Sequence, residues 1–124
     1  MGKFILKKTK NDGFMFNLLA TNGQVICTSQ TYASKASAKN GIESVRKNVG
    51  AEIEDQTLAE PESKKNPKWE LYKDKGGDFR FRLCASNGEP ILSGQGYTTK
   101  ENAKNGIDSI RRNAPESEIV EELD

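Results

Sequence analysis

The amino-acid sequence repeats itself along its length. Residues 14–48 align with residues 79–113 without a gap, and about half of the aligned positions are identical. The longest identical run is Ala38–Ile42, which returns as Ala103–Ile107. Identity at this level does not arise by chance over a segment of this length, so the chain contains two tandem copies of one unit. Any fold for this chain must therefore use the same unit twice.

The segment between the copies reads as a linker. Residues 59–66 carry charges of both signs, include Pro61, are followed by Pro67 and show no hydrophobic periodicity. We divide the chain into a first repeat (1–58), a linker (59–66) and a second repeat (67–124). With 124 residues, of which 34% are hydrophobic, the chain is long enough for one ordinary core. Residues 1–124 are therefore predicted to form a single domain with pseudo-twofold symmetry.

Each repeat begins with three predicted β-strands. In the first repeat, Phe4 and Leu6 alternate with Lys3, Ile5 and Lys7, and a turn at residues 11–13 leads into a second strand. Phe14, Phe16 and Leu18 share one face of that second strand, and a turn at residues 22–23 precedes the third. The same pattern returns in the second repeat. There, Pro90 cannot donate a ladder hydrogen bond, so the third strand lies at a sheet edge or begins at Pro90.

A helix follows the three strands in each repeat, because the hydrophobic period changes to three and four residues. Ser34 and Thr99 are suitable N-caps. Gly41 and Gly106 fall in the apolar stripe despite the cost of glycine in a helix, which predicts a close approach to the sheet. A short strand then ends each repeat. The apolar stripes are Ala38, Gly41, Ile42 and Val45 in the first copy, and Ala103, Gly106, Ile107 and Ile110 in the second.

Both copies carry the motif Tyr-x-x-Lys-x-x-Ala-x-Asn-Gly-Ile, at residues 32–42 and 97–107. With this motif and this order of elements, the chain resembles the YegP-like proteins, which are described as a domain of unknown function. The resemblance covers nearly the whole chain apart from the linker. It implies an α+β fold in which two tandem β(3)-α-β repeats form a single antiparallel sheet with two helices on one face. It also implies exchange of the C-terminal strands, with Ile53 in the sheet of the second repeat and Ile119 in that of the first.

A physical argument supports the pairing independently. One repeat of about 55 residues buries too little apolar surface to offset its conformational entropy. Two repeats that share one sheet also remove two exposed strand edges.

Composition excludes several kinds of function. The chain has no histidine, which removes the usual general base and the commonest zinc ligand, and it has no glycine-rich phosphate-binding loop. We predict no catalytic site, no cofactor and no metal. The formal net charge is +1, so bulk charge does not favour a nucleic-acid partner. No apolar stretch approaches the length of a membrane span, and we predict a cytoplasmic protein without membrane contact.

Alternation along the strands predicts which residues face away from the helices. In the first repeat this outer face would be mainly apolar, and in the second basic and aromatic. If helices cover only one face, the first half would present a sizeable exposed apolar patch, which usually marks an interface. The predicted outer residues are Ile5, Met15, Asn17, Leu19, Val25 and Cys27 in the first repeat, and Glu70, Tyr72, Arg80, Arg82, Cys84 and Leu92 in the second.

Three functions of different class remain open. The favoured hypothesis is a non-catalytic module, monomeric or weakly self-associating, that binds a protein through the open sheet face. The candidate surface is Tyr72, Arg80, Arg82, Met15 and Leu19. The alternative is single-stranded nucleic-acid binding, with Arg80 and Arg82 on phosphates and Tyr72 stacked on a base. The third is an enzyme acting through Cys84 or Cys27, although neither has an evident activating base.

One further set of polar residues occurs in both copies: Gln30, Tyr32 and Asn40, repeated as Gln95, Tyr97 and Asn105. We interpret them as partners of backbone groups around the helix entry and the sheet, with ligand binding as the alternative.

Overall fold

The computed structural model describes residues 2–60 and 63–123. Residues 61 and 62, which belong to the predicted linker 59–66, and the two terminal residues lie outside the described part. The α+β class and the three strands, helix and short strand of each repeat are confirmed. The elements are β1 (Lys3–Lys8), β2 (Phe14–Leu19), β3 (Val25–Ser29), α1 (Lys35–Asn48), β4 (Ile53–Asp55), β5 (Lys68–Lys73), β6 (Phe79–Cys84), β7 (Pro90–Gly94), α2 (Lys100–Asn113), a 3-10 turn (Ala114–Glu116) and β8 (Glu118–Glu122).

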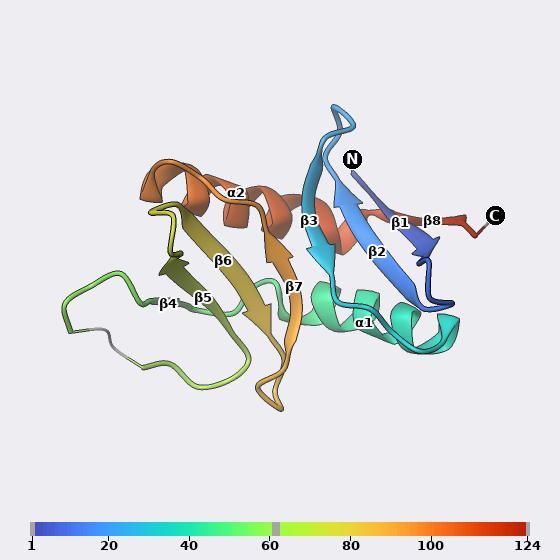
Figure 1. Cartoon of the computed structure of the whole chain (residues 1–124), viewed down its shortest axis with the longest axis horizontal. Helices are drawn as coiled ribbons and strands as arrows, with labels where there is room; N and C mark the ends of the chain where they lie inside the picture. Colours follow the sequence, from blue (N-terminus) through green and yellow to red (C-terminus); the bar gives the residue numbers. More distant parts are fainter. Residues whose placement is uncertain (1, 61–62, 124) are drawn as a thin grey trace.

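The strands form one sheet of eight in the order β4-β5-β6-β7-β3-β2-β1-β8 (Figure 1). The predicted exchange is confirmed, because Ile53 of β4 pairs with Trp69 of β5 and Ile119 of β8 pairs with Phe4 of β1. The expectation of a wholly antiparallel sheet is corrected. Both exchanged strands run parallel to their neighbours, since each follows a helix that carries the chain back along the sheet.

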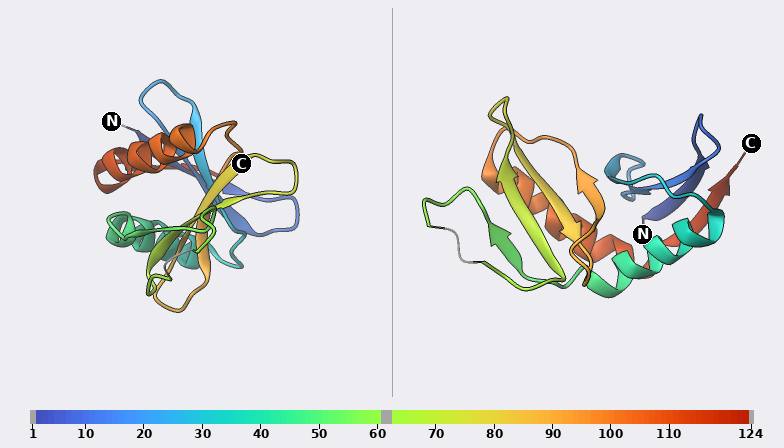
Figure 2. Two further views of the ribbon diagram at one scale, coloured as in Figure 1. Left: turned by 90° about the vertical axis from the view of Figure 1, so that its left-hand side faces the viewer. Right: turned by 60° about the horizontal axis from the view of Figure 1, so that its bottom comes forward.

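Both helices lie on one face of the sheet (Figure 2), as predicted. Helix α1 packs on β2 of its own repeat and on β7 of the other, while α2 packs on β6 and β3. The predicted caps are present, because Ser34 Oγ accepts a hydrogen bond from Ser37 N at 3.0 Å and Thr99 Oγ1 accepts one from Asn102 N at 3.1 Å. The two apolar stripes are buried against the sheet, so each helix contributes to a core shared by both repeats.

The side-chain pattern of the third strands departs from simple alternation. The pairing of β2 with β3 shifts at Leu18/Leu19, and that of β6 with β7 shifts at Leu83/Cys84. Each shift is a β-bulge that adds one residue to the third strand. As a result Cys27 and Leu92, which we predicted on the outer face, belong to the core beneath the helices. Of the two alternatives predicted for the third strand of the second repeat, the structure confirms that it begins at Pro90. The strand, β7, does not lie at an edge but in the middle of the sheet.

The side chain of Tyr32 packs against the helix at Gly41, and that of Tyr97 packs against the helix at Gly106. A Cβ on Gly41 would be 2.4 Å from the hydroxyl oxygen of Tyr32, and one on Gly106 would be 2.6 Å from that of Tyr97. Each tyrosine ring stacks on a core phenylalanine, with Tyr32 and Phe16 centroids 6.2 Å apart. The predicted close approach is confirmed, and the tyrosine of the repeated motif is the group that requires it.

Two arginines hold the chain where it crosses between the repeats. Arg46, near the end of α1, donates from Nη2 to the carbonyl oxygen of buried Ser117, just before β8. Its counterpart Arg111 donates to the carbonyl oxygens of Val49 and Ala51 at 3.1 and 2.7 Å, just before β4. Each arginine thus satisfies backbone groups of the segment that leads into the exchanged strand.

The lysine of the repeated motif makes a related contact on each side. Lys35 Nζ lies 2.6 Å from a carboxylate oxygen of Glu121 in β8, and Lys100 Nζ lies 3.0 Å from one of Asp55 in β4. Both ion pairs join a helix to an exchanged strand at the sheet edge, so the motif lysine links each helix to the sheet that it covers.

The tyrosine–glycine contact predicts a loss of stability on adding one methyl group. Gly41→Ala should lower the free energy of unfolding, because over-packing costs about 1–3 kcal/mol and outweighs the gain of about 1 kcal/mol in helix propensity. Gly50→Ala is the matched control, since nothing lies within 4 Å of a Cβ at that position. Denaturant unfolding measures both variants. A Gly41→Ala protein as stable as Gly50→Ala would contradict the assigned contact.

The arginine contacts predict a difference between neighbouring cations. Arg46→Ala and Arg111→Ala should each lower the free energy of unfolding by about 1–3 kcal/mol, because a buried carbonyl loses a charged donor. The exposed neighbours Lys47 and Arg112 occupy equivalent positions in the two repeats. Lys47→Ala and Arg112→Ala should change it by no more than about 0.5 kcal/mol. If all four variants lowered the free energy of unfolding in urea equally, the loss would come from the interaction of positive charge with the helix dipole and not from the carbonyl contacts.

Candidate functional site

The uncovered face of the sheet carries a row of directly paired residues that crosses all eight strands. From β4 to β8 the row changes from charged to polar to apolar, although the two halves are related by the repeat. Its members are Glu54, Glu70, Arg82, Ser93, Thr28, Asn17, Ile5 and Val120. The uncovered face has therefore changed its chemical character between the repeats, whereas the face beneath the helices is apolar in both.

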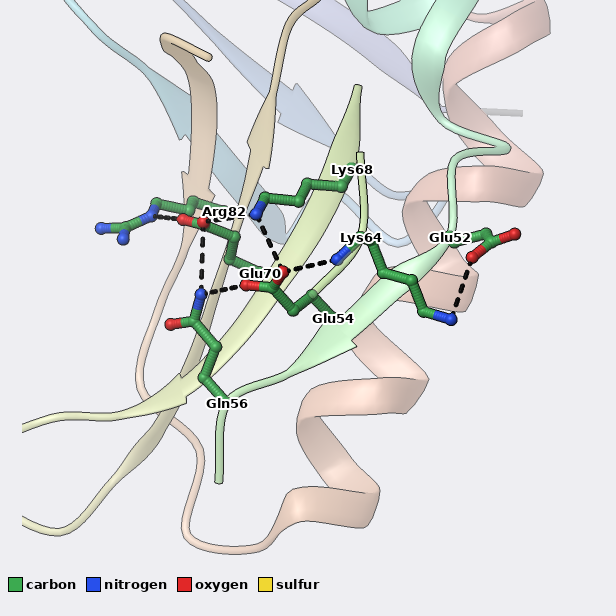
Figure 3. Close-up of polar contacts among 7 residues, drawn as sticks. All are labelled: Glu52, Glu54, Gln56, Lys64, Lys68, Glu70 and Arg82. Carbon is green, nitrogen blue, oxygen red and sulfur yellow. Dashed lines mark hydrogen bonds and ion pairs between the residues drawn. The ribbon is translucent and has the colours of Figure 1, made fainter. Parts of the chain in front are cut away.

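Glu54 is the centre of the charged half (Figure 3). It is 5% exposed, and its carboxylate accepts hydrogen bonds from Gln56 Nε2 at 2.5 Å, Lys64 N at 2.8 Å and Lys68 Nζ at 2.9 Å. These bonds, with that of Gln56 the most important, lower the pKa of Glu54 from 4.5 to about 2. The interaction joins the exchanged strand β4, the segment before β5 and β5 itself.

Glu70 extends the network to β6. One carboxylate oxygen contacts Nε of Arg82, and the other lies 3.4 Å from Lys68 Nζ and 3.2 Å from Gln56 Nε2. Burial acts to raise the pKa of Glu70, but Arg82 and Lys68 outweigh it and the pKa is lowered. Figure 3 shows that Glu70 holds Arg82 by Nε alone, so the two terminal nitrogens of the guanidinium point away from the network.

The structure brings Tyr72 and Arg82 together. The guanidinium carbon of Arg82 lies 4.8 Å from the centroid of the Tyr72 ring, which is a cation–π contact. Beside the pair is a hollow of about 280 Å³ on the uncovered face, where β3 and β7 diverge. Ser29, Gln30 and Ser93 supply polar groups to it. The pair therefore forms one wall of a recess near the middle of the sheet.

Arg80 has a different role from the one predicted. Its Nε lies 2.5 Å from Asp74 Oδ2, and Asp74 Oδ1 accepts hydrogen bonds from Gly76 N and Asp78 N. Arg80 thus supports the β5–β6 turn and does not line the hollow. Hydrogen bonding by Arg80, and then by the turn amides, lowers the pKa of Asp74.

The apolar half of the face is less exposed than expected. Ile5 is 5% exposed and Asn17 is 8%, while Met15 and Leu19 are half-buried. Among the described residues, the large hydrophobic side chains in the exposed class are Val25 and Leu58. The predicted sizeable apolar patch is therefore wrong in extent, in part because the β-bulge turns Cys27 into the core.

Both cysteines are free and buried, on opposite faces of the sheet. Burial raises the pKa of the Cys27 thiol to about 12. Burial, followed by the neighbouring Glu70, raises the pKa of Cys84, which lies on the outer face. Both thiols are therefore protonated near neutral pH and are poor nucleophiles.

The arrangement of acidic and cysteine side chains and the character of the helices relate to the predictions about metal binding and membrane contact. In the part of the chain that the structure describes, no three or more Cys, Asp or Glu side chains are grouped to hold a metal ion. Across residues 2–60 and 63–123, no helix has the length and apolar character that crossing a membrane requires.

Sequence reasoning missed Glu54, which it left in a short terminal strand. The pair of residues at this place in the two repeats gave a signal. In the first sheet edge Val120 of β8 pairs with Ile5, whereas at the equivalent place in the other edge Glu54 of β4 pairs with Glu70. Two acidic side chains directly opposite each other in a parallel pair require cations between them. Lys68 is that cation here.

Comparison with known proteins finds one family and close relatives. The family model described as a domain of unknown function (DUF1508) matches twice, at residues 9–55 and 74–121. A UPF0339 protein from Pseudomonas aeruginosa is 39% identical over 97% of this chain and 96% of its own length. A UPF0339 protein from Treponema denticola is 52% identical over 54 residues, about the length of one repeat, and the match covers 44% of this chain and 93% of that protein.

A solved structure agrees with the fold. The solution NMR structure of yegP from E. coli, a protein of unknown function, matches with a TM-score of 0.81 at 34% identity and covers 98% of this chain and 93% of that one. None of the names of these proteins records an enzymatic activity.

The environment of Glu54 predicts a pH-dependent contribution to stability. Because the pKa of Glu54 is lowered from 4.5 to about 2 in the folded state, its contribution is fully present above pH 4.5 and is lost as the pH falls toward 2. Glu54→Gln should cost about 1–3 kcal/mol at neutral pH. The difference from wild type should shrink between pH 4.5 and 3 in urea unfolding.

The control for this experiment is Glu52→Gln, because the Glu52 side chain is 73% exposed in its ion pair with Lys64. That change should stay within about 0.5 kcal/mol at neutral pH. A Glu54→Gln difference that persists undiminished at pH 3 would refute the proposed pKa.

Burial of the thiols predicts slow alkylation of the native protein. At pH 8, a rise in the pKa of Cys27 from 9.0 to about 12 lowers its thiolate fraction roughly 1,000-fold. Iodoacetamide should therefore label native Cys27 far more slowly than free cysteine, and mass spectrometry of tryptic peptides follows each site. Unfolding in guanidinium chloride should restore ordinary rates at both cysteines. Native labelling as fast as the free thiol would return the cysteine-enzyme hypothesis to consideration.

Proposed function

This chain belongs to the DUF1508 family, a domain of unknown function, and we propose from its site that it is a non-catalytic module that binds a protein through the uncovered face of the sheet. The observation that carries the proposal is the Tyr72–Arg82 pair beside the hollow where β3 and β7 diverge. Tyrosine and arginine are the residue types that most often dominate the energy of protein interfaces.

The pair has the properties of an interface anchor. Glu70 fixes Arg82 through Nε and Tyr72 covers the guanidinium plane, so little side-chain freedom remains to be lost on binding. The terminal nitrogens of Arg82 are directed away from the network and suit a carboxylate, which two parallel N–H donors bind well. The partner that fits presents an acidic side chain to Arg82 and a neighbouring group to the hollow.

The half-buried side chains of the other repeat extend this surface. Met15 and Leu19 lie on the same face in β2, which β6, β7 and β3 separate from Tyr72 in β5. They would add apolar contact area for a partner large enough to span the sheet.

A catalytic role has less support. The chain has no histidine, and burial keeps both cysteine thiols protonated by raising the pKa of each. The ionic network around Glu54 and Glu70 is saturated with partners, which suits a structural role and not proton transfer. We propose that the protein acts without a cofactor.

Single-stranded nucleic acid is the second candidate, because Tyr72 with Arg80 and Arg82 could provide stacking and phosphate contacts. Each of these arginines already has a carboxylate partner, Asp74 or Glu70, and the formal net charge is +1. The field that a polyanion requires is therefore locally cancelled.

We also propose a cytoplasmic monomer. Two free and buried thiols suit a reducing compartment. The exchange of strands within one chain completes the sheet without a second subunit.

The proposal is tested by affinity capture from cell lysate with four immobilised proteins: wild type, Tyr72→Ala, Arg82→Glu and the control Lys7→Glu. Lys7 is the repeat counterpart of Tyr72 and is exposed on the apolar half. A protein identified by mass spectrometry should be retained by wild type and Lys7→Glu and reduced at least about tenfold by both other variants. Melting curves confirm that all four proteins are folded.

Equal retention by all variants would contradict the assigned surface. Salt-dependent binding of single-stranded oligonucleotides that Arg82→Glu abolishes, with no protein captured, would favour the nucleic-acid alternative instead.

A further inference from the structure

A polar groove is lined by residues of α1 and of the β6–β7 turn. Figure 1 shows where these two elements lie in the fold. The groove consists of two adjoining hollows of about 210 and 430 Å³, which share Asn40, Ser44 and Asn87. Gln30 and Tyr32 line one part and Asn48 the other. The helix comes from the first repeat and the turn from the second, so the groove exists only when the repeats are assembled.

The duplication provides an internal test of which surfaces are constrained. Six polar residues that line the groove have identical counterparts in the other half: Gln30, Tyr32, Asn40, Ser44, Asn48 and Asn87 correspond to Gln95, Tyr97, Asn105, Ser109, Asn113 and Asn22. Four other lining residues differ, since Ser37, Ser86, Glu89 and Pro90 correspond to Asn102, Thr21, Gln24 and Val25. On the outer face of the sheet, by contrast, Ile5, Met15 and Asn17 correspond to Glu70, Arg80 and Arg82. The side-chain amides of the groove are therefore kept in both repeats, whereas the polar groups of the outer face are not.

Some of this identity has a structural cause. Asn22 and Asn87 each accept a hydrogen bond from a turn amide at 3.0 Å, and each tyrosine packs over a helix glycine. Asn48 donates to Ser44 Oγ at 3.2 Å, and Asn113 donates to the carbonyl oxygen of Ser109 at 2.8 Å. These contacts explain why the fold retains those residues.

No such contact explains why Asn40 and Asn105 are identical in the two repeats. Both side chains are exposed in the middle of a helix, where asparagine is a poor helix former. Within the described residues neither makes a hydrogen bond or an ion pair. A residue that weakens the helix, has no partner and is nevertheless present in both copies at a groove requires another explanation, and binding of a ligand provides one.

The chemistry of the groove defines the ligand class. Side-chain amides and hydroxyls offer donors and acceptors together, and each sugar hydroxyl also does both. Glu43 and Lys47 at the rim cancel in charge, as do Asp108 and Arg112 in the other half. Glu89 adds a negative charge to the first groove where the other half has Gln24, so a charged ligand would not suit both. Tyr32 and Pro90 supply a small apolar surface that suits the C–H face of a sugar ring.

We propose that Asn40 and Asn105 are ligand-binding residues of two equivalent sites for an uncharged saccharide, one between α1 and the β6–β7 turn and the other between α2 and the β2–β3 turn. The first site shares Gln30, Pro90 and Ile91 with the hollow beside Tyr72 and Arg82, but Tyr72 and Arg82 themselves do not line it.

The test is an NMR titration of the ¹⁵N-labelled full chain with glucose, maltose, N-acetylglucosamine and chitobiose, and with triglycine as a peptide probe. At least one saccharide should shift the backbone amides of Asn40, Ser44 and Asn87 together with those of Asn105, Ser109 and Asn22. Asn40→Ala should weaken the response of the first set at least about tenfold and leave the second unchanged, and Asn105→Ala should do the reverse.

Glu101→Ala, an exposed helix position outside the groove, is the matched control and should leave both sets unchanged. The separate loss of one set in each variant distinguishes binding from a general structural effect. Absence of localised shifts with every saccharide, shifts that survive in both asparagine variants, or a response to triglycine alone would overturn the proposal.

Discussion

The whole structure depends on the fact that neither repeat completes its own sheet. Each half takes its edge strand from the other, and Arg46 and Arg111 satisfy the backbone of the two segments that cross over. The core residues of both repeats then pack beneath two helices that each touch strands of both repeats. Strand exchange thus turns two units that are too small to be stable alone into one sheet with two edges instead of four.

This arrangement explains why the two faces of the sheet diverged to different degrees. Beneath the helices, side chains of both repeats pack in one core, so that face stays apolar even where Trp69 stands for Phe4 and Leu92 for Cys27. On the uncovered face the constraint is only that charges be paired. One half meets it with the Glu54–Lys68–Glu70–Arg82 network, and the other replaces the ionic groups by Ile5 and Val120. The Tyr72–Arg82 surface arises from that divergence.

The two candidate surfaces are related to the duplication in opposite ways: the Tyr72–Arg82 surface depends on residues that differ between the repeats, and the groove on residues that are identical. The sheet-face surface is unique to the second repeat, and a partner there would meet only one site per chain. The groove residues occur twice and are built across the boundary between repeats. Both depend on the assembled sheet, because the hollow beside Tyr72 lies where β3 of one repeat meets β7 of the other.

The sequence by itself determined the repeat, the order of strands and helices, the helix caps at Ser34 and Thr99 and the buried stripes, because these depend on local periodicity and on groups a few residues apart. The tertiary structure decided the rest. Bulges reversed the orientation of Cys27 and Leu92, since one inserted residue shifts the alternation. Gln56 is a local partner of Glu54, but Lys68 and the carbonyl partners of Arg46 and Arg111 come from segments further along the chain or from the other repeat. No local pattern specifies which distant carbonyl or amine will lie within hydrogen-bonding distance.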